Sequence, residues 1–447
     1  MKIERFYDDN LAHASYAILS NGEIALIDPG RNPQPYLDFA NQNNASIKHV
    51  FETHPHADFV SSHLDIHRET GAVIHTSKDV GADYPHETFD QGDEVRLGKV
   101  TFKGMNTPGH SPDSISILLL EEDGREHAVF TGDTLFIGDV GRPDLRETVG
   151  NTTAKREELA RQMYRTIHTK FVQLQDDTVV YPAHGAGSLC GKNLSTDEHS
   201  TIGRERSENW AFKNMSEDQF INNILEDQPF VPKYFGYAVE TNKKGAPSYK
   251  TSIMNVKRFN DVSQIPEATL IIDTRKESEY KKGHLPHSVN IMLTEKGKFE
   301  TWVGAIVDPT ESYVLLTDTP EELEKAIVRV AKIGYEKNLV GGVAVKGAKL
   351  PLSSEQLDVE QFSNDLDGYS IVDVRNEGEV KAGKYFKNAI SIPLHQLREK
   401  SYEIPTDKPV VVHCAAGYRS AVGSSILESK LKDLKVYDLG EAISDFK

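Results

Sequence analysis

Cysteine is scarce in this chain: Cys190 and Cys414 are the only two among 447 residues. Two cysteines cannot form a disulfide framework, so a reducing compartment is expected. The first nine residues, MKIERFYDD, contain no apolar segment of the kind that signal peptides carry. Stretches of apolar residues such as 115–120 are far too short to cross a bilayer. We therefore expect a cytoplasmic protein that does not enter a membrane.

Positive charge is also in short supply, with 51 Lys and Arg against 68 Asp and Glu and a formal net charge of −17. Nucleic acid and anionic membranes are therefore excluded as default partners, because the chain would repel both. A small anionic substrate would need a local pocket of Arg side chains or backbone N–H donors. At about 150 residues per domain, the length predicts three domains.

Two segments of the C-terminal half repeat each other. TLIIDTRKESEYKKGHLPHSVNI (269–291) parallels YSIVDVRNEGEVKAGKYFKNAISI (369–392), and an apolar strand-like run follows each copy. A repeat of domain length indicates duplication, and strands alternating with helices indicate small parallel α/β units. The first 190 residues also alternate strand-like and helix-like segments. We therefore expect a multidomain α/β chain with domains at 1–245, 255–350 and 356–447.

Histidines follow an apolar run in the stretch THPHADF (53–59), which contains His54 and His56. Side chains two positions apart on an extended strand point the same way, and paired imidazoles suit a divalent transition metal. By contrast, His63 and His67, spaced four residues apart on a predicted helix, are interpreted as surface residues.

Further candidate ligands come directly after other apolar runs. They are His110 in NTPGHSPDS, Asp133 in FTGDTLF and His184 in YPAHG, each in a loop rich in Gly and Pro. Solvated loop histidines are the alternative, but several such residues in this order favour a metal centre.

These motifs, together with GDVGRPD (138–144), resemble the metallo-β-lactamase superfamily over about residues 1–240, and within it the glyoxalase II and persulfide dioxygenase branch. The resemblance implies an αββα sandwich with metal at one edge of its sheets. Glyoxalase II enzymes hydrolyse thioesters with two metals, whereas persulfide dioxygenases use one iron. In two-metal members, the residue at position 59 binds the second metal beside Asp58 and His184.

Phe59 helps to decide between these alternatives: a phenyl ring offers no lone pair, so a mononuclear site is favoured. By resemblance, its ligands are His54, His110 and Asp133, a two-histidine, one-carboxylate set that suits Fe(II), with zinc as the alternative. His56, Asp58 and His184 are then expected to orient ligands or water, or to bind an alternative metal.

Two residues near these motifs, Arg142 and Cys190, each have two possible roles. Arg142 either binds an anionic persulfide or sulfite, or pairs with Asp144. Cys190, six residues after His184, is either a buried small hydrophobe or a thiol with a chemical role.

A second chemical motif is VVVHCAAGYRS (410–420), in which a strand-like run ends at Cys414 and Arg419 follows five residues later. Backbone N–H groups of such a loop and the start of the next helix favour a thiolate nucleophile. The motif resembles the rhodanese family, which implies that Cys414 carries sulfur as a persulfide, assisted by Arg419. The first copy has Thr317 at the equivalent position, so we expect an inactive rhodanese-like domain that serves as a spacer or docking module.

The whole chain thus resembles persulfide dioxygenase–rhodanese fusions of bacterial sulfide detoxification. The resemblance implies oxidation, with O₂, of a persulfide of glutathione, coenzyme A or another thiol to sulfite, followed by rhodanese transfer that yields thiosulfate. A homo-oligomer is also expected. The alternatives are a glyoxalase II-like zinc thioesterase and a sulfane-sulfur carrier or sensor.

Overall fold

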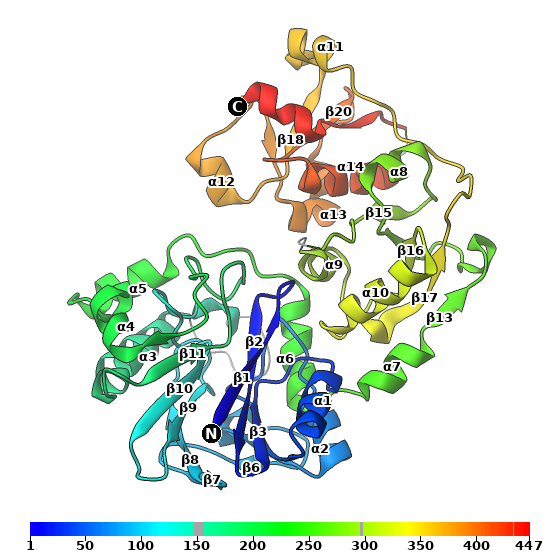
Figure 1. Cartoon of the computed structure of the whole chain (residues 1–447). Helices are drawn as coiled ribbons and strands as arrows, with labels where there is room; N and C mark the ends of the chain where they lie inside the picture. The colour runs from blue at the N-terminus through cyan, green and yellow to red at the C-terminus, as the bar shows by residue number, and fades with distance from the viewer. Residues whose placement is uncertain (147–155, 296–297, 432) are drawn as a thin grey trace. The chain divides into compact units, whose positions relative to one another are not determined.

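The computed structural model describes residues 1–146, 156–295, 298–431 and 433–447. The chain forms two compact units, one of Met1–Ser252 with Ala331–Gly334 and one of Ile253–Val330 with Tyr335–Lys447 (Figure 1). The described residues include no helix with the length and apolar composition that a membrane span needs.

Two six-stranded sheets form the centre of the first unit. The strands of one sheet, in order, are β1 (Lys2–Asp8), β2 (His13–Ser20), β3 (Glu23–Ile27), β4 (Ser46–Phe51), β5 (Val73–Thr76) and β6 (Glu87–Thr88). Those of the other are β12 (Ser200–Thr201), β11 (Val179–Pro182), β10 (Glu126–Gly132), β9 (Ile115–Leu120), β8 (Val100–Asn106) and β7 (Glu94–Leu97).

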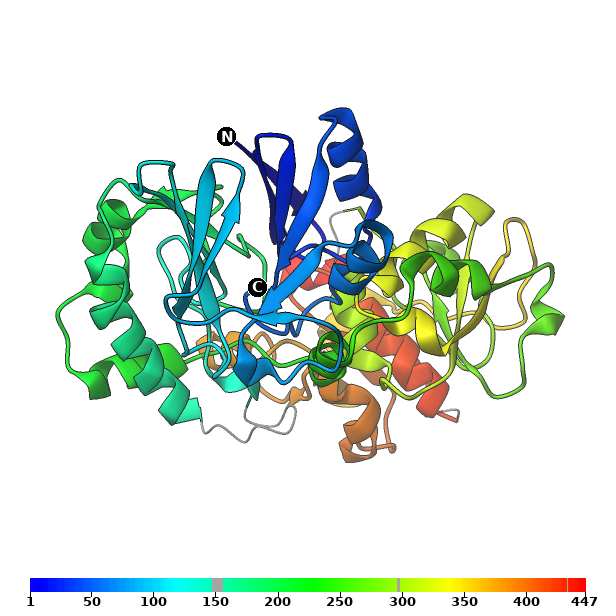
Figure 2. The same ribbon diagram turned by 90° about the horizontal axis from the view of Figure 1, so that it is seen from below.

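Alternation along the strands determines the layers, because neighbouring side chains point to opposite faces. In β3, Ala25 and Ile27 join the core between the sheets, whereas Ile24 and Leu26 face α1 (Gln34–Gln42) and α2 (His63–Thr70). The other sheet packs its outer face on α3 (Arg156–Thr169), α4 (Ile202–Glu208) and α5 (Glu217–Leu225). Figure 2 shows the two sheets between these outer helices. The expected αββα sandwich is confirmed.

Backbone hydrogen bonds join the two sheets at one edge, where several strands end. Ile115 N donates to Thr53 O at 2.8 Å, and Ala14 N donates to Ala183 O at 2.7 Å. Gly132, at the end of β10, has φ +52°, and a Cβ there would lie 2.5 Å from Thr53 Oγ1. A glycine is therefore needed for β10 to approach the loop after β4.

The second unit contains two parallel sheets. The first has the order β13 (Lys257–Phe259), β17 (Leu339–Ala344), β16 (Tyr313–Thr317), β14 (Leu270–Asp273) and β15 (Ser288–Asn290). The second has the order β19 (Ile390–Ser391), β18 (Ser370–Asp373), β20 (Val410–His413) and β21 (Val436–Asp438). Every residue of β14, β16, β18 and β20 is buried, as expected for parallel strands covered on both faces.

Helices of the second unit follow the same repeat. The first copy contains α8 (Glu277–Lys282), α9 (Phe299–Ile306) and α10 (Pro320–Ala331). The second contains α11 (Val359–Asn364), α12 (Glu377–Ala382), α13 (Leu397–Lys400) and α14 (Tyr418–Lys430). Two further helices, α6 (Tyr234–Lys244) and α7 (Tyr249–Asn255), lie in the segment that leads to this unit. The expected parallel α/β domains are confirmed.

The aspartate and arginine shared by the two copies form the same buried contact in each. Arg375 Nη2 donates to Asp373 Oδ2 at 2.7 Å and to Gly383 O at 3.0 Å. Arg275 makes the corresponding contacts to Asp273 and to the carbonyl of residue 283. In each domain this pair therefore ties the end of a central strand to the end of the following helix.

Candidate metal centre and sulfur-transfer loop

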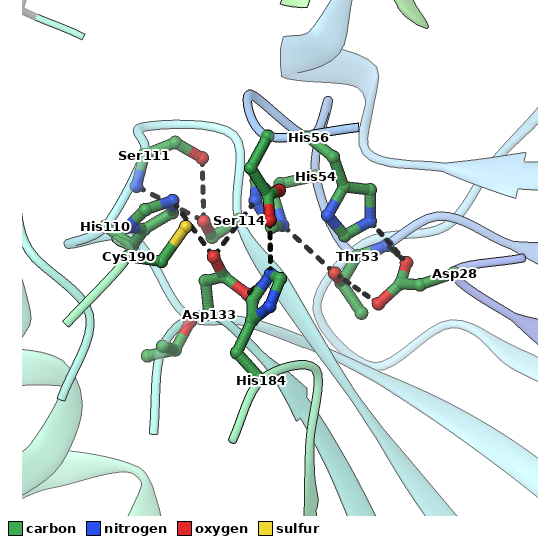
Figure 3. Close-up of polar contacts among 12 residues, drawn as sticks. Asp28, Thr53, His54, His56, His110, Ser111, Ser114, Asp133, His184 and Cys190 are labelled. Atoms are coloured by element: carbon green, nitrogen blue, oxygen red, sulfur yellow. Dashed lines mark hydrogen bonds and ion pairs between the residues drawn. The ribbon is translucent and has the colours of Figure 1, made fainter. Parts of the chain in front are cut away.

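The predicted metal-binding side chains meet at the edge where the two sheets are joined (Figure 3). They come from the loops after β4, β8, β10 and β11, and each is at most 5% exposed. The set is His54, His56, Asp58, His110, Asp133 and His184, with Cys190 beside it.

His54, His110 and Asp133 converge on one point. Asp133 Oδ2 lies 3.9 Å from His54 Nε2 and 3.6 Å from His110 Nε2. The opposite ring nitrogens are anchored, that of His54 by Thr53 Oγ1 at 3.1 Å and that of His110 by Arg142 O at 2.9 Å. Both imidazoles therefore turn Nε2 toward the same carboxylate.

Asp133 is the group that most requires a cation. Both of its carboxylate oxygens are buried and have no hydrogen-bond partner within the described chain. A buried charge in this state is costly unless a counter-ion compensates it. Metal–ligand bonds of about 2.1 Å place neighbouring ligand atoms roughly 3 to 3.5 Å apart, close to the spacing seen here. The donor set thus fits one divalent transition metal.

Arg142 is buried, and its guanidinium is committed to protein groups. Nε and Nη2 donate to Asp144 at 2.7 and 2.6 Å, and Nη1 donates to Leu189 O at 3.2 Å. Its backbone N–H donates to Cys190 O at 3.0 Å. Of the two interpretations made from the sequence, this geometry favours the pair with Asp144. Through its carbonyl, Arg142 also orients the His110 ring.

A second cluster lies next to the first. His184 Nε2 is 3.5 Å from Asp133 Oδ1 and 3.3 Å from Asp58 Oδ2, and the Cys190 thiol lies within reach of both His184 and Asp58. Burial alone would lower the pKa of His184, but the Asp133 and Asp58 carboxylates raise it well above its usual value. Burial, together with these carboxylates, raises the pKa of Cys190. The cluster therefore favours a charged imidazole beside a protonated thiol.

Phe59 fills the space beside this cluster. Phe59 is 1% exposed, and its ring packs against both the His13 and His56 rings, with centroid distances of 3.9 and 4.3 Å. His13 was not singled out in the sequence, because it precedes the motifs and belongs to the unrecognised hairpin of β1 and β2. An isolated antiparallel β-bridge pairs the backbones of His13 and His184, which are distant in sequence, and brings His13 to the site.

His56 faces a separate carboxylate pocket. Its Nε2 lies 3.1 Å from Asp28 Oδ1 and 3.9 Å from Glu52 Oε2. Burial alone would lower the pKa of His56, but Asp28 and Glu52 raise it to about 9. Asp28, at φ +50°, also accepts from Thr53 N and Oγ1. It therefore orients the loop that carries the metal ligands.

The interpretation of His63 as a surface residue is wrong. His63 is 1% exposed; its ring lies 4.4 Å from the Tyr84 ring, centroid to centroid, and its Nδ1 lies 3.5 Å from Glu52 Oε1. Helix α2 turns this residue inward, and Glu52 is the acidic partner that was not recognised in the sequence.

The loop Cys414–Gly417 connects β20 to α14 and surrounds a buried sulfur. Gly417 N donates to Cys414 Sγ at 3.1 Å, and the φ of Gly417 is +103°. The guanidinium of Arg419 pairs with both carboxylate oxygens of Glu379 in α12. Arg419 thus secures the start of α14 to its own domain.

The first copy is built differently at the equivalent point. Thr317 occupies the position of Cys414, because Leu316 and His413 pair with the equivalent aspartates of β14 and β18. Only Asp318 and Thr319 separate β16 from α10, and Thr319 forms reciprocal capping bonds with Glu322. The two-residue connection is too short for backbone N–H groups to surround a sulfur atom at position 317.

Comparison with known proteins agrees with these domains. The metallo-beta-lactamase superfamily model matches residues 8–184, and the rhodanese-like domain model matches residues 257–344 and 358–446. A solved metallo-beta-lactamase structure from Staphylococcus aureus subsp. aureus COL is 31% identical, with a TM-score of 0.69. That match covers 77% of this chain and 99% of the other. The chain therefore belongs to the metallo-beta-lactamase superfamily and also carries rhodanese-like domains.

Curated relatives match about half of the chain. A hydroxyacylglutathione hydrolase from Francisella tularensis subsp. novicida is 27% identical over 51% of this chain and 84% of its own length. A probable metallo-hydrolase from Burkholderia pseudomallei is 26% identical over 49% of this chain and 84% of its own length. Both relatives are named as hydrolases.

The raised pKa of His56 predicts a pH-dependent stability. In metal-free protein, the stabilisation that the protonated His56 imidazole provides is complete below pH 6.5. It is lost as the pH rises through about 9. Shifts of this size correspond to about 3 kcal/mol at most in unfolding free energy. We expect His56→Gln to reduce the slope of urea stability against pH between 6.5 and 9.5. His199→Gln, at an exposed position, is the control, and an unchanged slope in His56→Gln would contradict the assignment.

Proposed function

We propose that this chain is a persulfide dioxygenase coupled to rhodanese sulfur transfer. The first domain oxidises a low-molecular-weight thiol persulfide to sulfite and free thiol, and the last domain transfers sulfane sulfur to sulfite. The observation that carries the proposal is Phe59 at the second-metal position of a domain that shares its chain with the Cys414 loop. A glutathione or coenzyme A persulfide and a cytoplasmic location are part of the proposal.

His54, His110 and Asp133 are the residues proposed to hold iron. A set of two histidines and one carboxylate leaves coordination positions open, which suits non-haem Fe(II). Iron bound there would supply the redox chemistry that combines dioxygen with the persulfide sulfur. The chain supplies fixed imidazole orientations through Thr53 Oγ1 and the Arg142 carbonyl.

A second metal is disfavoured by the surroundings of Asp58 and His184. Phe59 removes the nitrogen ligand of two-metal relatives and fills its space with a ring packed against His13 and His56. The nearby Cys190 is a weak donor as well, because burial raises its pKa and favours the protonated thiol. One metal per domain is therefore the better-supported stoichiometry.

Positive charge for an anionic persulfide would come from the bound metal ion. The Arg142 donors are used by Asp144 and Leu189, and the His56 ring lies 3.1 Å from the Asp28 carboxylate. In a chain with a net charge of −17, a divalent cation held by His54, His110 and Asp133 would offset local repulsion of a persulfide or sulfite.

The last domain is proposed to carry the sulfane sulfur on Cys414. Sulfite attacks the outer sulfur of the Cys414 persulfide, so that a sulfur–sulfur bond forms in thiosulfate and the bond to Cys414 breaks. The electron pair of the broken bond stays on Cys414 as a thiolate. Gly417 N–H and the start of α14 stabilise that charge.

Thioester hydrolysis is a second candidate, because a curated relative is named a hydroxyacylglutathione hydrolase. In that case zinc would supply an activated water, and the six-residue set around Asp133 would bind two metals. Phe59 weakens this candidate, and the two rhodanese-like domains have no evident part in it. A carrier or sensor without oxygen uptake is the remaining alternative.

Metal content separates the mononuclear and dinuclear proposals. We expect wild-type protein purified without oxygen to contain one iron per chain by plasma mass spectrometry. Phe59→His should raise the metal content toward two, because it returns a nitrogen beside Asp58 and His184. Phe59→Leu, which stays apolar, is the matched control and should keep one metal. Two zinc ions in wild-type protein would contradict the proposal.

Asp133→Ala should abolish dioxygen consumption with glutathione persulfide, because it removes the carboxylate shared by both histidines. A loss of more than about 100-fold is expected, since even groups that only support metal ligands contribute 10 to 100-fold. Sulfur transfer from thiosulfate to cyanide should persist. Asp123→Ala, at an exposed turn, serves as the control. Loss of both activities would argue against independent sites.

Cys414→Ser should leave sulfite as the end product of persulfide oxidation. The variant keeps the size of the side chain but lacks a sulfur that can hold the sulfane atom. Thiosulfate and sulfite are quantified by chromatography after bimane labelling. Thr317→Ser, at the equivalent position of the first copy, should form thiosulfate at the wild-type rate. Wild-type thiosulfate formation by Cys414→Ser would refute the assigned role.

A further inference from the structure

We propose that the first rhodanese-like domain holds the catalytic loop of the second in place, with Tyr418 and Ser425 as positioning residues. This inference rests on the proposed role of Cys414 in sulfur transfer. It gives the domain that lacks a sulfur-carrying cysteine a task within the same reaction.

The contact begins at the edge of the first parallel sheet. Strand β15 is an edge strand, and such strands leave outward N–H groups without a strand partner. Asn290 N donates to Ser425 Oγ of α14 at 2.9 Å, while Ser425 Oγ donates to Val422 O at 2.7 Å. The catalytic helix of one domain thus provides an acceptor for the sheet edge of the other.

The composition of α14 agrees with burial on two sides. Residues 420–427 are all buried, including Ser420, Ser424 and Ser425. A helix at the surface of a single domain normally shows one apolar stripe and one polar face. Here α14 packs against β20 and β21 of its own domain and against β15 of the first. Small residues along the helix permit this close approach from both directions.

Tyr418 connects the loop itself to the first domain. It follows Gly417, whose N–H contacts the Cys414 sulfur, and its hydroxyl donates to Met292 O at 3.3 Å. The next residue, Arg419, pairs with Glu379 in the same domain as the loop. Consecutive residues therefore anchor the loop on two different domains. This fixes the direction in which the loop N–H groups point.

Two ion pairs fix the orientation of the two rhodanese-like domains near α14. Lys281 Nζ lies 2.7 Å from Asp438 Oδ2, whose side chain is 2% exposed. Arg398 donates to both oxygens of Glu311 at 2.7 and 2.9 Å, and also to Ile306 O at 2.9 Å. The Arg398–Glu311 pair is bidentate and both pairs are partly buried, so they constrain orientation more than isolated surface pairs do. The Tyr418 and Ser425 contacts are thus made across a fixed interface.

The test compares hydroxyl deletions in the full-length chain. Tyr418→Phe and Ser425→Ala remove the interdomain bonds and keep most of the packing. Tyr402→Phe is the control for the first, because Tyr402 is 79% exposed in the same domain. Ser429→Ala is the control for the second, because Ser429 Oγ makes the same type of bond, to Ile426 O, on the same helix.

We expect each test variant to lower kcat/KM for thiosulfate–cyanide transfer by about threefold to tenfold, the worth of one hydrogen bond. Hydrogen exchange of the loop amides at 415–417 should accelerate, while exchange in β18 and β20 stays at wild-type rates. Both controls should match the wild type. Wild-type kinetics and wild-type loop exchange in Tyr418→Phe would overturn the proposal. A wild-type chain without transfer activity would refute the proposed sulfur transfer only. Hydrogen exchange of the loop would still test whether the first rhodanese-like domain holds the loop in place.

Discussion

Charge compensation at Asp133 governs the arrangement of the first domain's site. Its two oxygens are buried without a hydrogen-bond donor in the described chain, beside the Nε2 atoms of three histidines. Burying an anion in this way is affordable only with a nearby positive charge. Without metal, protonated imidazoles are the available cations, as the raised pKa of His184 indicates. Cation binding and proton release at this edge are therefore linked.

Residues outside the ligand set hold the ligand loops together. Asp139 accepts hydrogen bonds from Trp210 Nε1 and from the backbone N–H groups of Lys192 and Asn193. Glu205 accepts from Gly138 N and is 1% exposed. These contacts join the loop after Asp133 to the segment that contains Cys190. The GDVGRPD motif is thus explained by loop geometry, because its polar groups pair within the protein.

Much of the fold and the candidate site could be predicted because the informative residues are close in sequence. Strand alternation and ligands placed directly after apolar runs are local signals, and they located His54, His110, Asp133 and the Cys414 loop. The partners that tune those residues come from distant segments. His13 reaches the site across a bridge to His184, and Glu52 meets His63 only because α2 folds back. Spacing alone carries no information about such contacts.

The short connection between β16 and α10 makes the loss of sulfur chemistry in the first copy hard to reverse. A thiol placed at Thr317 would gain no ring of backbone donors, because the chain enters the helix after two residues. The first turn of α10 also carries Glu321 and Glu322, which repel an anion there. Recovery would require an insertion as well as a point change. The duplicated domain is therefore released from the need to hold a sulfur, while its contacts with α14 remain.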